Sequence, residues 1–382
     1  MTTQFNPATD KLIVSCDGGG IRGLIVALLL QQIDSAQPNF LGQTYLHAGT
    51  STGGIISLAM ACGIDLGEIV SLYENDGSQI FTTSACLGNT NVAAKLAAAP
   101  DPNASGNSWW TYIIDHIMEL LCVWYDNGGL KQAVVNTLGS STATATLNSL
   151  VPAAPASPQY VLVNTLQLCD SNNTWVPLQL TNLPNLPNNN SGVTLVIDAA
   201  MSTSAAPMYF PPYQHPTYGY CADGGLFANN PGTIAITSLM ASGIALENIW
   251  MLSISTGNTL DCYPPSIINT VGAGNFGPLF WIFPTSQPDP AVANQPYTPA
   301  LPLMSAFFDG TSEIDDFQCA QLLGGQYGRY VRANIPLTTP IALDDYSSAA
   351  IQAMKTAVTN YAQPSSTSEW GLIQSWIKNN FG

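Results

Sequence analysis

The chain has 382 residues, of which 46% are hydrophobic, so it can bury a large core as one α/β domain or as a domain with a smaller subdomain. Only 8 basic residues stand against 24 acidic ones, which gives a net charge of −16. This balance opposes binding to nucleic acid and electrostatic docking on anionic lipid headgroups. Any contact with a membrane or micelle would therefore use apolar surface.

The first ten residues are polar and lack the basic and apolar regions of a signal peptide. The longest apolar runs, 24–30 and 55–64, fall short of the roughly 20 residues that a membrane-spanning helix needs. We therefore expect a soluble, cytoplasmic protein without a transmembrane segment, able to make peripheral contact with a membrane. Eight cysteines occur singly, without a CxxC pair, which disfavours zinc and redox motifs and is typical of small core residues.

Two units of strand, turn and helix open the chain. Residues 11–16 predict a buried parallel strand, because a short apolar run ends there at a glycine cluster, and a helix follows from residue 23 to about 35. The second unit has a strand near 45–48, a turn at Ser51 and a helix over about 52–62. A further helix, capped by Asp65, is expected near 66–80.

The later elements are less regular. Residues 83–155 predict an insertion on the rim of the sheet, and 263–302 predict either a mobile cover over a site or a plain surface excursion. We interpret residues 1–336 as one domain and 337–382 as a C-terminal helical segment packed on it. The other expected elements are a helix at 109–124, a hairpin of 160–168 and 174–180, a helix at 193–202, strands at 249–254 and 327–335, and helices at 346–361 and 368–379.

Ser51 lies in a turn of small residues between a predicted strand and a predicted helix. Such a turn is cramped and holds a serine hydroxyl clear of the sheet, a need that Gly49 and Gly53 meet. The helix start behind Ser51 also points backbone amides at any developing oxyanion. Taken alone, these five residues could equally form an ordinary junction between a strand and a helix.

The glycine loop at 18–23 fits two different sites. It matches G-x-G-x-x-G after a strand and before a helix, as in dinucleotide-binding proteins, but no acidic residue lies about 20 positions further on. The better interpretation is an oxyanion hole, in which the amides of Gly19 and Gly20 turn inward toward an acyl oxygen. Arg22 would then anchor the loop or act on the site through its charge, although a surface arginine at a helix start remains the alternative.

The base for Ser51 is harder to identify. In the usual hydrolase order the histidine follows the serine and the acid along the chain, yet the last of the three histidines is His215. Asp223, in an Asp-Gly-Gly turn, is the leading candidate for a carboxylate base, and it would need burial among apolar neighbours to act near neutral pH. An ordinary triad of Ser51, His215 and Asp198 stays open as an alternative.

Five blocks together resemble the patatin-like phospholipase family, in that family's order. They are DGGGIRG at 17–23, GTSTG at 49–53, SAAPMYFPP at 204–212, DGGLFANNP at 223–231 and LSISTG at 252–257. The resemblance covers about residues 10–260. It implies an α/β fold with a mostly parallel central sheet flanked by helices, and a nucleophile elbow at a strand-helix turn.

The resemblance also implies the chemistry of the site. Ser51 would be the nucleophile, Asp223 the general base, and Gly18, Gly19, Gly20 and Arg22 the oxyanion loop. Thr52 would add its amide, and the motif-supporting glycines are Gly49, Gly53, Gly224 and Gly225. The family needs no metal and no cofactor. The implied activity is cleavage of fatty-acyl esters of phospholipids or related acyl lipids at a membrane or micelle surface.

Rival functions share parts of this pattern. An acyltransferase that passes the acyl group to an alcohol other than water would have every motif. A storage protein with residual esterase activity could keep the same fold. The sequence leaves the headgroup, the ester position, the oligomeric state and any regulator open.

Overall fold

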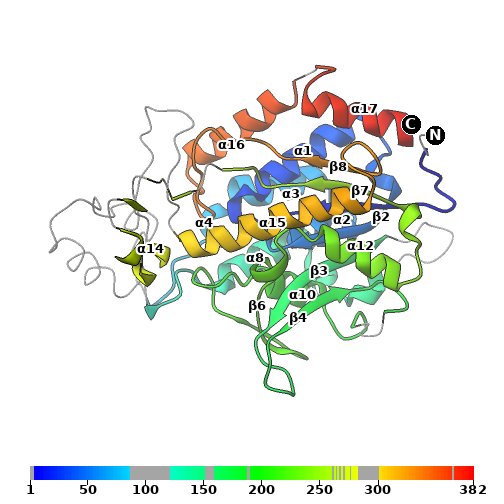
Figure 1. The fold of residues 1–382 in the computed structure, drawn as a ribbon. Helices are drawn as coiled ribbons and strands as arrows, with labels where there is room; N and C mark the ends of the chain where they lie inside the picture. The colour runs from blue at the N-terminus through cyan, green and yellow to red at the C-terminus, as the bar shows by residue number, and fades with distance from the viewer. Residues whose placement is uncertain are drawn as a thin grey trace.

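The computed structural model describes residues 4–86, 121–150, 159–186, 190–259, 301–363 and 365–382, together with parts of 262–282. A central sheet lies between layers of helices (Figure 1). The strand order is β5-β6-β3-β2-β1-β7-β8, with β4 paired to β3. The strands are β1 Lys11–Cys16, β2 Thr44–Thr50, β3 Tyr160–Gln167, β4 Val176–Thr181, β5 Tyr213–His215, β6 Gly219–Asp223, β7 Ile249–Ile254 and β8 Tyr330–Ala333.

The centre of the sheet is parallel. Strands β3, β2, β1, β7 and β8 pair in parallel, whereas β4, β5 and β6 pair antiparallel at one side. The larger helices are α1 Gly23–Ala36, α2 Thr52–Ala61, α3 Leu66–Asn75, α8 Asn127–Leu138, α10 Val196–Thr203, α12 Gly232–Ala241, α15 Pro302–Leu322, α16 Ser348–Tyr361 and α17 Glu369–Phe381. The shorter ones are α4 Gly77–Ile80, α9 Ser140–Ala143, α11 Gly225–Ala228 and α14 Pro278–Ile282.

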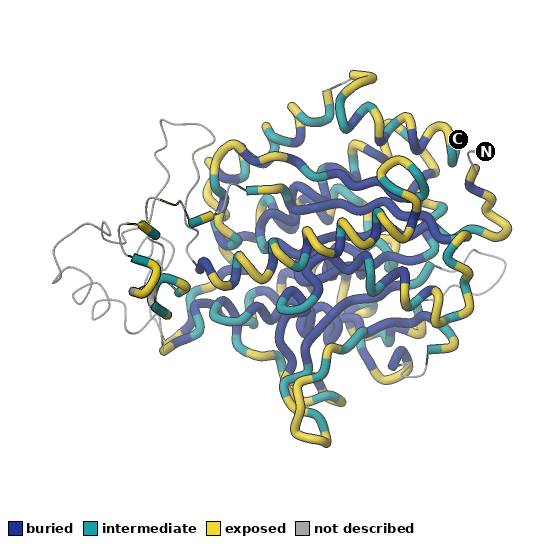
Figure 2. The backbone as a smooth tube through the Cα atoms, viewed as in Figure 1, coloured by how far each residue is buried: buried dark blue, intermediate teal, exposed yellow. Residues whose placement is uncertain are grey.

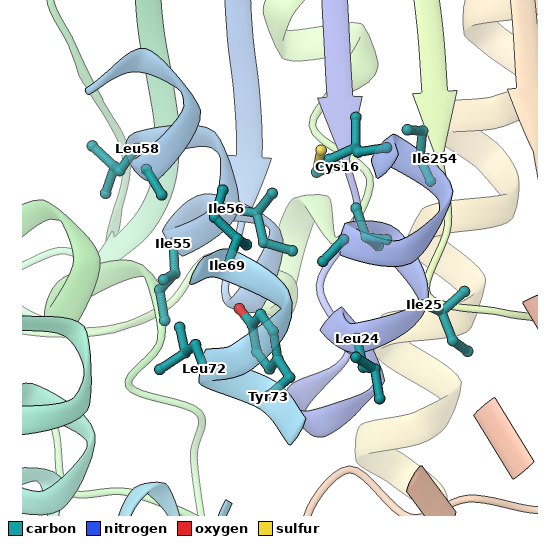
Figure 3. Packing of buried hydrophobic residues seen from close by; sticks show 14 of the residues in the cluster. Cys16, Leu24, Ile25, Ile55, Ile56, Leu58, Ile69, Leu72, Tyr73 and Ile254 are labelled. Carbon is teal, nitrogen blue, oxygen red and sulfur yellow. The ribbon is translucent and has the colours of Figure 1, made fainter. Parts of the chain in front are cut away.

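Alternating side chains of β1 build two separate cores. Leu12, Val14 and Cys16 pack with α1, α2 and α3 on one face, whereas Ile13 packs with α12 and the C-terminal part of α15 on the other. The parallel strands are accordingly buried along nearly all of their length, whereas the antiparallel strands β4, β5 and β6 are partly exposed (Figure 2). Figure 3 shows the first core, with Tyr73 of α3 among side chains of α1 and α2. The carboxyl ends of β1 and β2 are thereby held between two packed layers.

Most sequence predictions of elements agree with the structure. Strands β1 and β7 match the expected ranges, β3 and β4 form the expected hairpin, and α16 and α17 lie near their predicted positions. The α/β class with a mostly parallel sheet is confirmed. The predicted helix over 66–80 is wrong as one element, because it divides into α3 and α4 at Asp76 and Gly77. A Cβ at Gly77 would lie 2.4 Å from Cβ of Tyr346, which packs against this break.

Other predictions differ or are untested. Cys86 and Cys122 form a disulfide, so these two are not free core thiols, whereas Cys16, Cys221 and Cys319 are buried and free as expected. Most of the helix expected at 109–124 and of the loop 263–302 lies outside the described residues. The domain boundary at 336 stays a prediction. In the described parts of the chain, each helix is too short or too polar to cross a membrane.

Candidate active site

Ser51 occupies a strained turn between β2 and α2. Its φ of 55° is positive, although it is not a glycine, and its side chain is almost completely buried. The turn can close only because the flanking residues are small: a Cβ on Gly49 would lie 2.1 Å from the carbonyl oxygen of Gly53. This combination is the geometry of a nucleophile elbow.

A buried hydrogen-bond network holds the elbow in place. The amide of Ser51 donates to Thr203 Oγ1 over 2.9 Å, and Thr203 Oγ1 donates to the carbonyl oxygen of Asn164 over 2.6 Å. Asn164 Nδ2 donates to Thr50 Oγ1, which in turn donates to the carbonyl oxygen of Ala228. The network therefore ties the turn to α10, β3 and the segment after Asp223.

Asp223 lies at the end of β6 and is fully buried. Its Oδ1 accepts a hydrogen bond from the amide of Gly225 over 2.7 Å, whereas Oδ2 has no partner of normal geometry among the described residues. Burial raises the pKa of Asp223 to about 7, and hydrogen bonds from the Ser51 hydroxyl and the Gly225 amide oppose this rise. The structure thus brings Ser51 and Asp223 within interacting distance and leaves one carboxylate oxygen unpaired.

The space beside this carboxylate admits only glycine at positions 224 and 225. A Cβ on Gly224 would meet the carbonyl oxygen of Asn164 at 2.4 Å, and one on Gly225 would meet the ring of Phe308 at 2.8 Å. These contacts pack the turn after Asp223 tightly against β3 and α15.

The glycine loop follows β1 directly. The amide of Gly18 donates to the carbonyl oxygen of Asn229, so it is already engaged. In the described part of the chain, no hydrogen bond is made by the amides of Gly19 and Gly20, or by that of Thr52 at the start of α2. Gly20 has a φ of 58°, and a Cβ there would lie 2.1 Å from the carbonyl oxygen of Leu343.

Arg22 ends the short 3₁₀ turn that follows these glycines. Its side chain is buried, and its Nε has no hydrogen-bond partner among the described residues. The structure therefore places Arg22 in the interior beside the glycine loop rather than on the surface.

A pocket opens onto Ser51. Apart from Ser51, Thr52 and Ser204, its lining consists of glycine, apolar and aromatic side chains. These come from α2, α3, α4, α8, α15, the 3₁₀ turn Gly20–Arg22, the segment 204–210 and the loop positions 81 and 343: Gly20, Ile21, Ile55, Leu72, Tyr73, Ile80, Phe81, Leu130, Ala206, Tyr209, Phe210, Phe308 and Leu343. The apolar lining of the pocket is typical of a site for an apolar ligand.

The histidine of the alternative triad, His215, is engaged in contacts within its own segment. Nδ1 of His215, on β5, accepts hydrogen bonds from the amides of Thr217 and Tyr218. Asp198 accepts a hydrogen bond from the hydroxyl of Tyr213, and His215 does not line the pocket. His47 is buried within β2, and His116 lies outside the described residues.

Sequence reasoning missed the residues that support the site through tertiary contacts. Thr203 and Asn164 carry no motif signal of their own. Asp17 belongs to the glycine block, but its partner Arg332 lies far beyond it in the sequence. The small number of basic residues in the chain, 8, was the only sequence signal that bears on Arg332. Across the described ranges, no group of three or more His, Cys, Asp or Glu side chains is arranged to hold a metal ion.

Comparison with known proteins identifies the family. A family model for patatin-like phospholipase matches residues 14–236, which include the glycine loop, the elbow and Asp223. The chain belongs to the patatin-like phospholipase family.

Several curated proteins are similar to this chain. A cGAMP-activated phospholipase of Escherichia coli (strain TW11681) is 27% identical over 279 residues, covering 69% of this chain and 67% of that protein. A cGAMP-activated phospholipase of Vibrio cholerae is 30% identical over 237 residues, covering 59% and 56%. Patatin-like protein 1 of Oryza sativa subsp. indica is 25% identical over 291 residues, covering 67% and 60%. The chain thus spans 56 to 67% of the length of these relatives.

Solved structures of low identity also match. Human GIVD cytosolic phospholipase A2 is matched with a TM-score of 0.42 and 13% identity, covering 97% of this chain and 60% of that chain. VipD from Legionella pneumophila is matched with a TM-score of 0.40 and 12% identity, covering 92% and 67%.

Proposed function

We propose that the protein is a lipid acyl hydrolase of the phospholipase A type, which cleaves fatty-acyl esters of membrane lipids through an acyl-enzyme on Ser51. The observation that carries this proposal is the apolar pocket that ends at Ser51, with the buried carboxylate of Asp223 beside it. Membership of the patatin-like phospholipase family supports the same reaction class.

In the first step, Oδ2 of Asp223 takes the proton of the Ser51 hydroxyl while Oγ attacks the ester carbonyl carbon. A base works best when its pKa lies near the working pH, and burial brings the pKa of Asp223 to about 7. The hydrogen bond from Gly225 to Oδ1 fixes the carboxylate, and Oδ2 has no hydrogen-bond partner among the described residues, so it is available as the proton acceptor. The tetrahedral intermediate then expels the alcohol, which takes the proton from Asp223.

The negative charge of the intermediate needs hydrogen-bond donors. We assign this task to the amides of Gly19, Gly20 and Thr52, because these are not used within the described fold. The amide of Gly18 is bound to Asn229, so Gly18 holds the loop rather than the oxyanion. Arg22 adds a buried positive charge at the same loop. In the second step, Asp223 takes a proton from a water molecule, whose oxygen attacks the acyl carbon; the bond to Ser51 Oγ then breaks, Oγ takes the proton back from Asp223, and the fatty acid leaves.

The pocket suits the acyl chain of the substrate. Its walls are side chains such as Ile55, Ile80, Phe81 and Phe210, which can bury methylene groups but cannot bind a charged headgroup. The net charge of −16 favours neutral or zwitterionic lipids over anionic ones. We therefore expect turnover of phosphatidylcholine vesicles to exceed turnover of phosphatidylglycerol vesicles.

Covalent labelling tests the proposal directly. A fluorophosphonate probe should label the wild type and Ser57→Ala, whose hydroxyl is buried on the same helix, but not Ser51→Ala. Asp223→Asn should lose at least ~100-fold in kcat on a soluble ester, whereas Asp315→Asn, another buried aspartate, should keep its activity. Normal labelling of Ser51→Ala, or full activity of Asp223→Asn, would overturn the proposed chemistry.

A further inference from the structure

The residue before the glycine loop is bound by an arginine from the far end of the chain. Asp17 follows β1 and Arg332 lies on β8, and both side chains are buried. Arg332 Nη1 donates to Asp17 Oδ1 over 3.2 Å, and Nη2 donates to Oδ2 over 2.5 Å. This is a two-pronged contact between a planar guanidinium and a carboxylate, which fixes direction as well as distance.

The sheet register explains how Arg332 reaches Asp17. In β7, Ser253 pairs with Ser15 of β1 on one side and with Arg332 of β8 on the other. Arg332 extends over Ser253, to whose hydroxyl it donates over 2.7 Å, toward the end of β1. From α15, Asp316 approaches Arg332 Nε to 3.9 Å. The arginine thus joins β1, β7, β8 and α15 at one point.

Other residues also hold the glycine loop by hydrogen bonds. All but one of them lie after residue 236, where the family match ends. The amide of Asp17 donates to the carbonyl oxygen of Ile254, and Thr256 Oγ1 donates to that of Gly18 over 2.9 Å. The amide of Ile21 donates to the carbonyl oxygen of Leu343 over 2.8 Å. Asn229 is the exception, because it lies within the matched range and bonds to Gly18. The loop is therefore held mainly by the C-terminal third of the chain.

The contact between Asp17 and Arg332 differs from these hydrogen bonds, because it joins two charged side chains. Loss of the guanidinium would leave a buried carboxylate without an opposite charge one residue before Gly18. Relaxation of that carboxylate toward water would turn the loop, and a shift of about 1 Å in a catalytic group can cost ~100-fold in rate.

We propose that Arg332 is a positioning residue for the reaction: through Asp17 it fixes the glycine loop and thereby aims the amides of Gly19 and Gly20 at the substrate oxygen. This inference rests on the proposed function. Arg332 does not touch the substrate, so its loss should lower kcat and leave KM nearly unchanged, because the apolar pocket stays intact.

The test compares two arginine-to-lysine variants from the same edge of the sheet. Arg332→Lys keeps the charge but loses the two-pronged contact. Arg329→Lys is the matched control, because Arg329 bonds to the carbonyl oxygens of Leu246 and Ile249 at the opposite end of β7. The kcat and KM of a soluble short-chain ester and the Tm are measured for each variant.

We expect Arg332→Lys to lower kcat by at least ~10-fold with KM within about twofold, and Arg329→Lys to keep kcat within about twofold. The midpoint of the pH-rate profile should be the same in both variants, since Asp223 is not touched. The inference is overturned if Arg332→Lys keeps the wild-type kcat, or if its loss of kcat/KM comes from a higher KM. It is also overturned if Arg329→Lys shows an equal fall in Tm and loses as much kcat.

A second variant covers the case in which Arg332→Lys does not fold. The double variant Asp17→Asn with Arg332→Gln retains hydrogen-bonding side chains without a buried charge, and it should fold with a kcat at least ~10-fold below wild type. A wild-type kcat in this variant would refute the positioning role. Failure of the proposed function is distinguishable, since Ser51→Ala and Asp223→Asn would then retain activity.

Discussion

The amide of Ser51, the proposed nucleophile, donates a hydrogen bond of 2.9 Å to the hydroxyl of Thr203, so this backbone donor is engaged by the scaffold. Thr203 also donates to Asn164, so one hydroxyl holds both the elbow and β3. The positive φ of Ser51 is strained and persists only where surrounding contacts determine it. Thr203 is therefore a main support of the elbow conformation.

Thr203→Val should weaken both stability and catalysis. The change leaves the amide of Ser51 and the carbonyl of Asn164 without partners, which costs about 1–3 kcal/mol for each buried group. We expect a lower Tm and a kcat reduced by about 10-fold, measured by thermal unfolding and ester hydrolysis. Thr203→Ser keeps the hydroxyl and should remain close to wild type; equal losses in both variants would show that the methyl group matters instead.

The pH dependence of turnover should report Asp223. The carboxylate must be ionised to accept the Ser51 proton, and burial raises its pKa to about 7. We therefore expect kcat/KM of a soluble ester to rise with pH through a midpoint near 7 and then to level off. A limb centred near the ordinary carboxylate pKa of about 4 would contradict this assignment of the base.

His47 should make the fold sensitive to acid. Burial lowers its pKa from 6.5 to about 4, against an opposing hydrogen bond with Gln159. The neutral form is favoured in the folded protein, so the stabilisation is present above pH 6.5 and is lost as pH falls toward 4.

His47→Gln removes this titration. Its Tm should therefore fall less than that of the wild type between pH 7 and pH 4.5, as measured by calorimetry. The fall in Tm between the two pH values is compared, rather than the Tm itself, because the substitution also changes packing in β2. Parallel falls in Tm would assign the acid sensitivity to other groups.

Substitution of Phe308 should change the acyl chain length that the enzyme accepts. Phe308 lines the pocket from the inner side of α15, whereas Phe317 of the same helix is exposed. Phe308→Trp fills part of the pocket, so kcat/KM for long-chain esters should fall at least ~10-fold relative to short-chain esters. Phe317→Trp is the control and should leave this ratio unchanged. An unchanged ratio in Phe308→Trp would place the acyl chain elsewhere.

The central elements were predictable because each leaves a local signal. Strands β1 and β7 are short apolar runs between turn residues, and the turn at Ser51 needs small flanking residues for steric reasons that the sequence displays. The position of Asp223 before two glycines was visible in the same way. Its burial, which sets its pKa, was only an expectation until the fold was known.

Helix α15 and the supports of the site were not predictable in this way. The buried side of α15 includes Ser312 and Asp315 as well as Phe308 and Cys319, so apolar periodicity does not reveal the helix. Thr203 and Arg332 act through contacts with residues 152 and 315 positions away. Such contacts depend on which strands become neighbours in the sheet, and a single sequence does not reveal the order of the strands.

The pairing of Asp17 with Arg332 has a consequence for synthesis on the ribosome. The glycine loop is translated before β8, yet the guanidinium that binds Asp17 next to this loop belongs to β8, 315 residues later. A nascent or truncated chain that stops before β8 therefore lacks this brace, even with every motif residue in place. The contact between Asp17 and Arg332 can therefore form only after β8 has been synthesised.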